Sequence, residues 1–228
     1  MKVNVKLLAV QIFFTFLTFA VPLFLAAGTL NWIAGWAFLI LFFGFVIAIS
    51  YWLLRNNPDL LTERMKGAVQ EDQKTWDKIF FAIVGTLFVV WLLLMPLDAV
   101  RFGWSHVPGV LQAAGGVIFV VSFYLFFVTF RENSFLSPAV RVQDERGQTV
   151  ITTGPYHYVR HPMYAAFLVF VIGAALLLGS WLGLVFGAVL VILTGWRAVN
   201  EENVLRHELQ GYDAYMTQVK YRFVPYVW

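Results

Sequence analysis

Six apolar stretches restrict what this chain of 228 residues can fold into more than any other feature. Four of them contain no charged residue and run for 19 to 24 positions. About 20 helical residues at 1.5 Å each cross the roughly 30 Å hydrocarbon core of a bilayer. The last two stretches are shorter and meet at Gly179-Ser180, which predicts a tight helical hairpin rather than a re-entrant pair. The six stretches are Leu7–Ala27, Trp32–Leu54, Ile79–Leu97, Val107–Phe130, Tyr164–Leu178 and Trp181–Trp196.

The composition agrees with a membrane protein. Apolar residues make up 60% and charged residues 13% of the chain, whereas soluble domains carry about 25% charged residues. These values exclude a soluble enzyme, a disordered chain and a nucleic-acid-binding module. The absence of cysteine excludes disulfides, thiolate metal sites and cysteine nucleophiles. The expected fold is an all-α integral membrane protein with about six transmembrane helices, and the first stretch, at 21 residues, is too long for a signal-peptide core of about 7–15.

Basic residues are distributed unevenly between the two predicted sides. With the N-terminus in the cytosol, 15 of the 16 lysines and arginines fall on the inside and only Arg101 falls outside. The positive-inside rule then places both termini and all large polar segments in the cytosol. Any active site is expected on this cytosolic side, and Asp98 and Arg101 are expected to be solvated turn residues.

The polar segments divide the chain into two regions. Residues 1–130 form a four-helix membrane region with a cytosolic interfacial segment at 55–78, in which Asn57-Pro58 reads as an N-cap and a first helical proline. Residues 131–228 form the candidate catalytic core. It comprises a loop at 131–162, a helical hairpin at 163–199, and a C-terminal helix and tail at 200–228.

One polar loop ends in two histidines, three tyrosines and an arginine within Thr153–Tyr164. Pro162 fits the first turn of the following helix, whose free N–H groups suit an anion. The alternative is an aromatic and basic belt that anchors the helix at the lipid headgroups. His157 and His161 stand four apart, but the lack of cysteine and the position of Pro162 argue against zinc, and no metal is predicted.

A second cluster follows the last apolar stretch. Arg197 and Glu201 share one helix face, as do Glu202 and Arg206. They are either ordinary ion pairs on a helix entering water or a functional set, because ionisable groups at membrane depth usually line a cavity. No G-x-G-x-x-G motif follows a strand, so a Rossmann nucleotide site is not expected.

Together these motifs resemble the isoprenylcysteine carboxyl methyltransferase family, which belongs with the phospholipid methyltransferases. The resemblance covers roughly Arg141 to Trp228, and the N-terminal half resembles only the bacterial members, through Asn57–Leu61. Sterol reductases carry a similar R-H-P-N-Y, but here Met163 replaces the asparagine. The motifs are Val142-Gln143, Gln148-Thr149-Val150-Ile151, Gly154-x-Tyr156, Arg160-His161-Pro162-Met163-Tyr164, Arg197-x-x-x-Glu201-Glu202 and Gly211-Tyr212-x-x-Tyr215, with Pro225 in the tail.

The resemblance implies a non-Rossmann site for S-adenosylmethionine at the cytosolic ends of the last helices. It implies that Arg197 faces the methyl acceptor and that Arg197 and Glu201 are catalytic. Because the positive charge of Arg197 must stay available to the acceptor and not be neutralised by Glu201, the two side chains should point at different ligands. Whether Tyr212 and Tyr215 contact ligand is left open. The implied cofactor-binding residues are Gln143, Gln148, Thr149, Val150, Ile151, Tyr156, His161, Pro162, Met163, Tyr164, Glu201 and Glu202.

The chemistry favours carboxyl O-methylation of a lipid-like or amphipathic acid that arrives from the bilayer. A carboxylate is ionised at neutral pH and needs no general base, and the guanidinium of Arg197 offers a planar fork for bidentate contact. The alternatives are a phospholipid amine N-methyltransferase, an NADPH-dependent sterol-type reductase and a non-catalytic membrane protein. The expected partners are the acceptor and membrane lipids, with no nucleic acid and no metal.

Overall fold

The computed structural model describes residues 3–67, 70 and 73–228, and every regular element in these ranges is helical. Five helices are long and apolar enough to cross a membrane, which confirms an integral membrane protein. Lys2 and parts of the predicted segment 55–78 lie outside the described residues. The five long helices are α1 (Val5–Ala27), α2 (Ile33–Asn56), α4 (Thr75–Pro96, continued by a π-helical turn at Leu97–Arg101), α5 (Gly109–Glu132) and α7 (Trp181–Glu208).

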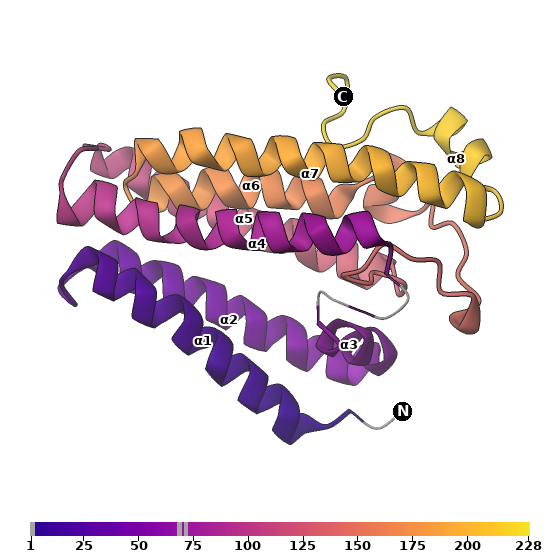
Figure 1. Ribbon diagram of the computed structural model, residues 1–228, viewed down its shortest axis with the longest axis horizontal. Helices are drawn as coiled ribbons and strands as arrows, with labels where there is room; N and C mark the ends of the chain where they lie inside the picture. The colour runs from indigo at the N-terminus through magenta and orange to yellow at the C-terminus, as the bar shows by residue number, and fades with distance from the viewer. Residues whose placement is uncertain (1–2, 68–69, 71–72) are drawn as a thin grey trace.

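The sixth apolar helix, α6 (Pro162–Leu177), is shorter, with 16 residues. It spans about 24 Å at 1.5 Å per residue, less than the hydrocarbon core. It packs against α5 and α7, and most of its residues from Phe170 on are buried. The predicted hairpin of α6 and α7 is therefore present, with its first helix enclosed by neighbours in the bundle (Figure 1).

Helices α5 and α6 approach closely because two glycines lie at their contact. A Cβ atom on Gly173 would lie 2.5 Å from the backbone nitrogen of Phe119, and one on Gly115 would lie 2.5 Å from that of Leu177. Around this contact the core is largely aromatic. The ring centroid of Phe119 lies 5.3 Å from that of Phe38 and 5.1 Å from that of Phe170.

The large polar segments gather at one end of the bundle, on the right in Figure 1. They include the short helices α3 (Pro58–Met65) and α8 (Tyr212–Gln218) and the loop between α5 and α6. The Asn57 side chain accepts from the N–H of Leu60, and Pro58 is the first residue of α3, as predicted. Basic segments that are far apart in the sequence are thus brought to one end.

At the opposite end the structure corrects one prediction. Asp98 is not a solvated turn residue but is fully buried. Its Oδ2 accepts from the hydroxyl groups of Ser105, at 2.6 Å, and Ser180, at 2.5 Å. Because Ser180 caps the N-terminus of α7, Asp98 fastens the hairpin turn to the end of α4. Arg101 is exposed, as expected.

Replacing Gly173 with alanine is expected to lower the stability of the protein by about 1–3 kcal/mol, because the new Cβ would meet the backbone of α5. The matched control is Gly44→Ala on α2, where a Cβ would meet nothing within 4 Å. Since alanine is the better helix former, the control should leave the melting temperature unchanged or raise it. Equal losses in both variants, measured by thermal unfolding in detergent, would contradict the close contact of α5 and α6.

Candidate active site

A cavity, partly open to solvent, lies at the polar end of the bundle. It is formed by the loop between α5 and α6, the start of α6, the last turns of α7, and α8. Eleven of the thirteen predicted site residues line this cavity, although they come from three separate parts of the sequence. Those eleven are Gln148, Thr149, Val150, Ile151, Tyr156, His161, Pro162, Met163, Tyr164, Arg197 and Glu201.

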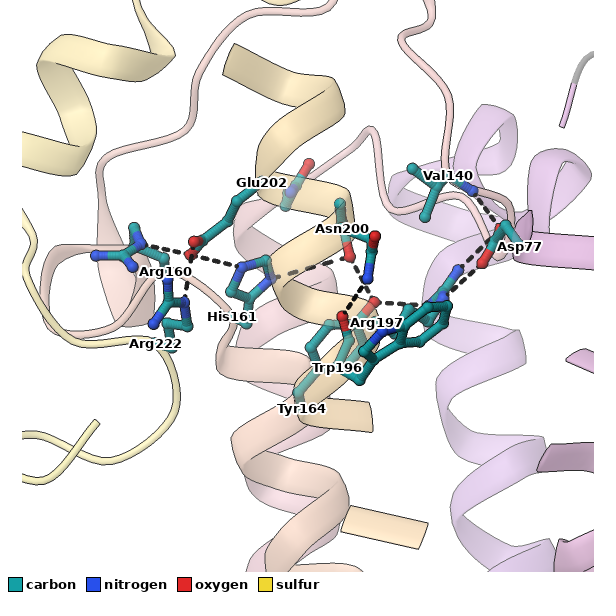
Figure 2. Close-up of polar contacts among 12 residues, drawn as sticks. Asp77, Val140, Arg160, His161, Tyr164, Trp196, Arg197, Asn200, Glu202 and Arg222 are labelled. Atoms are coloured by element: carbon teal, nitrogen blue, oxygen red, sulfur yellow. Dashed lines mark hydrogen bonds and ion pairs between the residues drawn. The ribbon is translucent and has the colours of Figure 1, made fainter. Parts of the chain in front are cut away.

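Arg197 stands in the cavity wall on α7 and is held by a residue of the N-terminal half, Asp77 on α4 (Figure 2). Its Nε donates to Asp77 Oδ1 at 2.8 Å and its Nη2 to Asp77 Oδ2 at 3.3 Å. Nη2 also donates to the carbonyl of Pro138, and Nη1 donates to the hydroxyl of Tyr164, both at 2.6 Å. The prediction that this fork is free for bidentate contact with an acceptor is therefore wrong, because Asp77 occupies it.

Asp77 is itself fully buried and well satisfied. Besides Arg197, its Oδ2 accepts from the backbone N–H of Val140 and from the side-chain amide of Gln73, each at 2.8 Å. One carboxylate thus joins α4, α7 and the loop that lines the cavity. Sequence reasoning missed Asp77. The available signal was an isolated acid in the first turn of an otherwise apolar helix.

Glu201 lies one turn after Arg197 and does not pair with it. Its Oε2 accepts from the hydroxyl of Tyr164 at 2.5 Å, and the nearest basic group with a contact to it is His161 Nδ1 at 4.0 Å. The three arginines that line the cavity are paired with other carboxylates: Arg197 with Asp77, Arg160 with Glu202, and Arg141 with Glu63. Glu201 is thus a cavity carboxylate without a cation at hydrogen-bond distance in the part of the chain that the structure describes, and it suits a positively charged ligand.

Glu202 does not form the expected pair with Arg206. Its Oε1 accepts from Arg160 Nε at 2.6 Å and lies 3.1 Å from His161 Nε2, and its Oε2 accepts from Arg222 Nε at 2.9 Å (Figure 2). The side chain is buried and is absent from the cavity wall. Its contacts tie α7 to the start of α6 and to the C-terminal tail. Arg206 instead bonds Asp213.

The tail also fixes the start of α6 through its backbone. The N–H groups of Arg160 and His161 donate to the carbonyls of Tyr221 and Arg222, each at 2.9 Å. At the helix start Pro162 has no N–H, and the N–H groups of Tyr164 and Ala165 donate to the carbonyl of His161. Among these first positions, which the structure describes in full, the N–H of Met163 is left for a ligand, fewer than the sequence led us to expect.

Gln143 shapes the loop and does not line the cavity. It is fully buried, its amide nitrogen donates to the carbonyl of Phe135 at 2.6 Å, and its backbone N–H donates to Gln148 Oε1 at 2.8 Å. The second bond closes the turn that presents Gln148–Ile151 to the cavity. Gln143 is therefore a positioning residue in this structure.

Helix α3 supports the same loop from the N-terminal half. Glu63 Oε1 accepts from Arg141 Nη2 at 3.0 Å and from the hydroxyl of Ser137 at 3.1 Å, and Glu63 Oε2 accepts from Lys66 at 2.7 Å. Burial alone would raise the pKa of Glu63, but the bonds from Lys66 and Arg141 hold that pKa at about 2. Glu63 is thus ionised at all physiological pH values.

Tyr212 and Tyr215 on α8 line the cavity, which the sequence left open. The Tyr215 hydroxyl donates to the carbonyl of Tyr156 at 2.7 Å, and Asn133 donates to the Tyr156 hydroxyl at 2.8 Å. Burial raises the pKa of all three tyrosines, so they are neutral phenols at physiological pH. With Val150 and Ile151 they form an apolar cluster in the wall of the cavity that Arg197 and Glu201 also line.

The part of the sequence that builds most of this cavity matches the model of a known family. Residues 104–210 match the family model described as phospholipid methyltransferase. That family is part of the isoprenylcysteine/phospholipid methyltransferase superfamily, so the match agrees with the resemblance seen in the sequence. The match begins before α5, the helix that packs against α6. A comparison with curated proteins gave no match.

The family match indicates an integral membrane methyltransferase. It covers the loop from α5 to α6, all of α6 and α7, and therefore most of the cavity wall. Asp77 and Glu63 lie outside the matched residues. Their contacts to the cavity loop and to Arg197 are therefore known from the structure and not from the family match.

A double-mutant cycle on Asp77 and Arg197 should show strong coupling. Replacing either residue with alanine leaves a buried charge without its partner and is expected to cost about 3–5 kcal/mol of unfolding free energy, whereas the double variant should lose much less than the sum. The readout is denaturant unfolding in mixed micelles.

The half-exposed pair Lys74–Glu208, which also joins α4 to α7, is the control and should show about 1 kcal/mol of coupling or less. Additive losses for Asp77 and Arg197 would mean that the buried pair does not hold the two halves together.

Proposed function

We propose that this protein transfers a methyl group from S-adenosylmethionine to the carboxylate of a lipid-like or amphipathic acid. The observation that carries the proposal is the juxtaposition in one cavity of a fixed arginine, an apolar wall, and a carboxylate that has no cation at hydrogen-bond distance among the described residues. The proposal includes the orientation predicted from the basic residues, with this cavity facing the cytosol of a bacterial inner membrane and the acceptor entering from the bilayer.

The residues present suit the cofactor. The cavity is concave and combines apolar walls with a few polar groups, as is usual for small-molecule sites. The wall of Val150, Ile151 and the buried tyrosines suits an adenosyl group, and Glu201 suits the amino group of the methionine part. When bound, the cofactor supplies a methyl group on a positively charged sulfur, which becomes a neutral thioether once the acceptor has taken the methyl carbon.

Arg197 would orient the acceptor rather than bind it with its whole fork. Two nitrogen atoms are held by Asp77, and one N–H of Nη1 is taken by Tyr164. This leaves the second N–H of Nη1, which can form one charge-assisted hydrogen bond to a carboxylate. Because a carboxylate is already ionised, this site needs no general base, and its contribution is alignment and exclusion of water.

The rings around Arg197 support entry from the apolar side. Its guanidinium carbon lies 4.7 Å from the ring centroid of Phe81 and 5.4 Å from that of Phe80. The neighbouring Trp196 is half exposed. A lipid-borne acceptor could therefore approach Arg197 along apolar and aromatic side chains without crossing water.

One observation favours a second candidate, N-methylation of a phospholipid amine. The charge of Arg197 is already balanced by Asp77, whereas Glu201 is a cavity carboxylate that could accept the proton an amine must lose. The family model is also described as phospholipid methyltransferase. The two candidates share the cofactor and differ in the charge of the acceptor.

Replacing Glu201 with glutamine should weaken cofactor binding about tenfold or more, because a neutral amide replaces the carboxylate expected to meet the amino group. Calorimetry with S-adenosylmethionine and its demethylated product would measure both affinities. The control is Glu208→Gln, on the same helix and outside the cavity wall. Unchanged affinity in Glu201→Gln would remove Glu201 from the cofactor site.

Replacing Arg197 with lysine should leave cofactor affinity within about threefold but lower turnover by about two orders of magnitude. The reason is that a compact ammonium cannot keep the contacts to Asp77, Pro138 and Tyr164 and also orient an acceptor. A methyl-transfer assay that compares lipid acids with lipid amines is the readout. Turnover of amines alone by the wild-type protein would replace the carboxylate proposal with the second candidate.

A further inference from the structure

A second hollow, away from the candidate active site, lies between α1 and the end of α3. It is shallow and opens widely at the surface. On one side, its lining residues lie three or four positions apart on a single face of α1. On the other side, its lining residues lie at the end of α3 and include an arginine. The lining residues are Val10, Gln11, Phe14, Thr15 and Thr18 of α1, with Arg64, Met65 and Gly67.

The wall on α1 is a lipid-facing surface. Val10 and Phe14 are 49% and 61% exposed, on a helix long and apolar enough to cross a membrane. The hydroxyls of Thr15 and Thr18 are directed to carbonyls of their own helix, so this wall presents mainly carbon atoms. The amide of Gln11 donates to the carbonyl of Met65 at 3.2 Å, which fastens α1 to α3 at the polar end of the hollow.

Arg64 supplies a positive charge at that polar end. Its guanidinium lies over the ring of Phe130, with the central carbon 5.0 Å from the ring centroid. Its Nη1 is buried and has no hydrogen-bond partner, and no carboxylate in the described ranges 3–67, 70 and 73–228 pairs with this guanidinium. Burial, and then the charge of Arg197, lower the pKa of Arg64 to about 10, so it remains charged at neutral pH.

A buried guanidinium nitrogen without a partner is unfavourable unless an anion meets it. Acidic groups nearby are used by other residues: Glu63, next to Arg64, bonds Lys66, Arg141 and Ser137. No carboxylate of the described residues therefore meets Arg64, so its guanidinium suits an anion from outside the chain, and the carbon-lined face of α1 directly beside it suits an acyl chain. Both features are present in one hollow that opens on the membrane-facing side of α1.

We propose that this hollow binds an anionic phospholipid, with the phosphate at Arg64 and one acyl chain along Val10, Phe14 and Thr18. From Val10 to Thr18 the face extends about 12 Å along the helix, enough for the upper part of a chain. The lipid would hold α1 against α3, the helix whose Glu63 supports the cavity loop. The proposal is independent of methyl transfer.

The experiment is thermal unfolding in neutral detergent with added phosphatidylglycerol, or with phosphatidylcholine of the same chains. Phosphatidylglycerol should raise the melting temperature of the wild-type protein by roughly 2–4 °C more than phosphatidylcholine does. In Arg64→Met this difference should disappear, and the melting temperature without lipid should equal or exceed that of the wild type, because the unpaired charge is gone. Arg64→Lys, which keeps the charge, should retain the preference.

Arg55→Met is the matched control, since Arg55 lies at the same end of the bundle, in the last turn of α2, and is exposed. It should keep the full response to phosphatidylglycerol. The same response in wild type and Arg64→Met, or its loss in Arg55→Met as well, would overturn the proposal. Inorganic phosphate that reproduces the whole shift would show an anion site and overturn the assignment to a lipid.

Discussion

The buried ion pair between Asp77 and Arg197 joins the two halves of this protein. Arg197 stands in the wall of the cavity, yet most of its hydrogen bonds go to groups outside the last helices. Two charges removed from water are tolerated here because the carboxylate and the guanidinium also bond Val140, Gln73, Pro138 and Tyr164. The pair therefore sets the position of α4, α7 and the cavity loop together.

A second polar cluster, around Glu202, holds the other side of the cavity. It joins α7 to Arg160, His161 and Arg222, so the start of α6 and the tail are fixed by one carboxylate. His161 links the two clusters, since its ring lies between Glu202 and Glu201 and stacks on Tyr164. Glu202 thus supports the cavity wall, whereas Glu201 faces the cavity and is available to a ligand. The proposed function rests on this difference between the two glutamates.

The positions of the helices could be predicted from the sequence because the length and hydropathy of each apolar stretch depend only on neighbouring residues. Length and hydropathy indicated the spans, and Asn57-Pro58 and His161-Pro162 indicated two helix starts. Most residues of the cavity wall could be named in advance because the family resemblance implied them. The partners of buried charges did not, because Asp77 meets Arg197 across 120 positions and Asp98 meets Ser180 across 82. Such contacts depend on how helices pack, which no local pattern contains.

Binding of S-adenosylmethionine in the cavity on the last helices can be tested by ultraviolet crosslinking of cofactor that carries a labelled methyl group, followed by peptide mapping. We expect the label in the segments 148–164 or 197–215, which line the cavity, and we expect the demethylated product to suppress it. Labelling confined to α1–α4, or labelling that the product does not suppress, would contradict a cofactor site in this cavity.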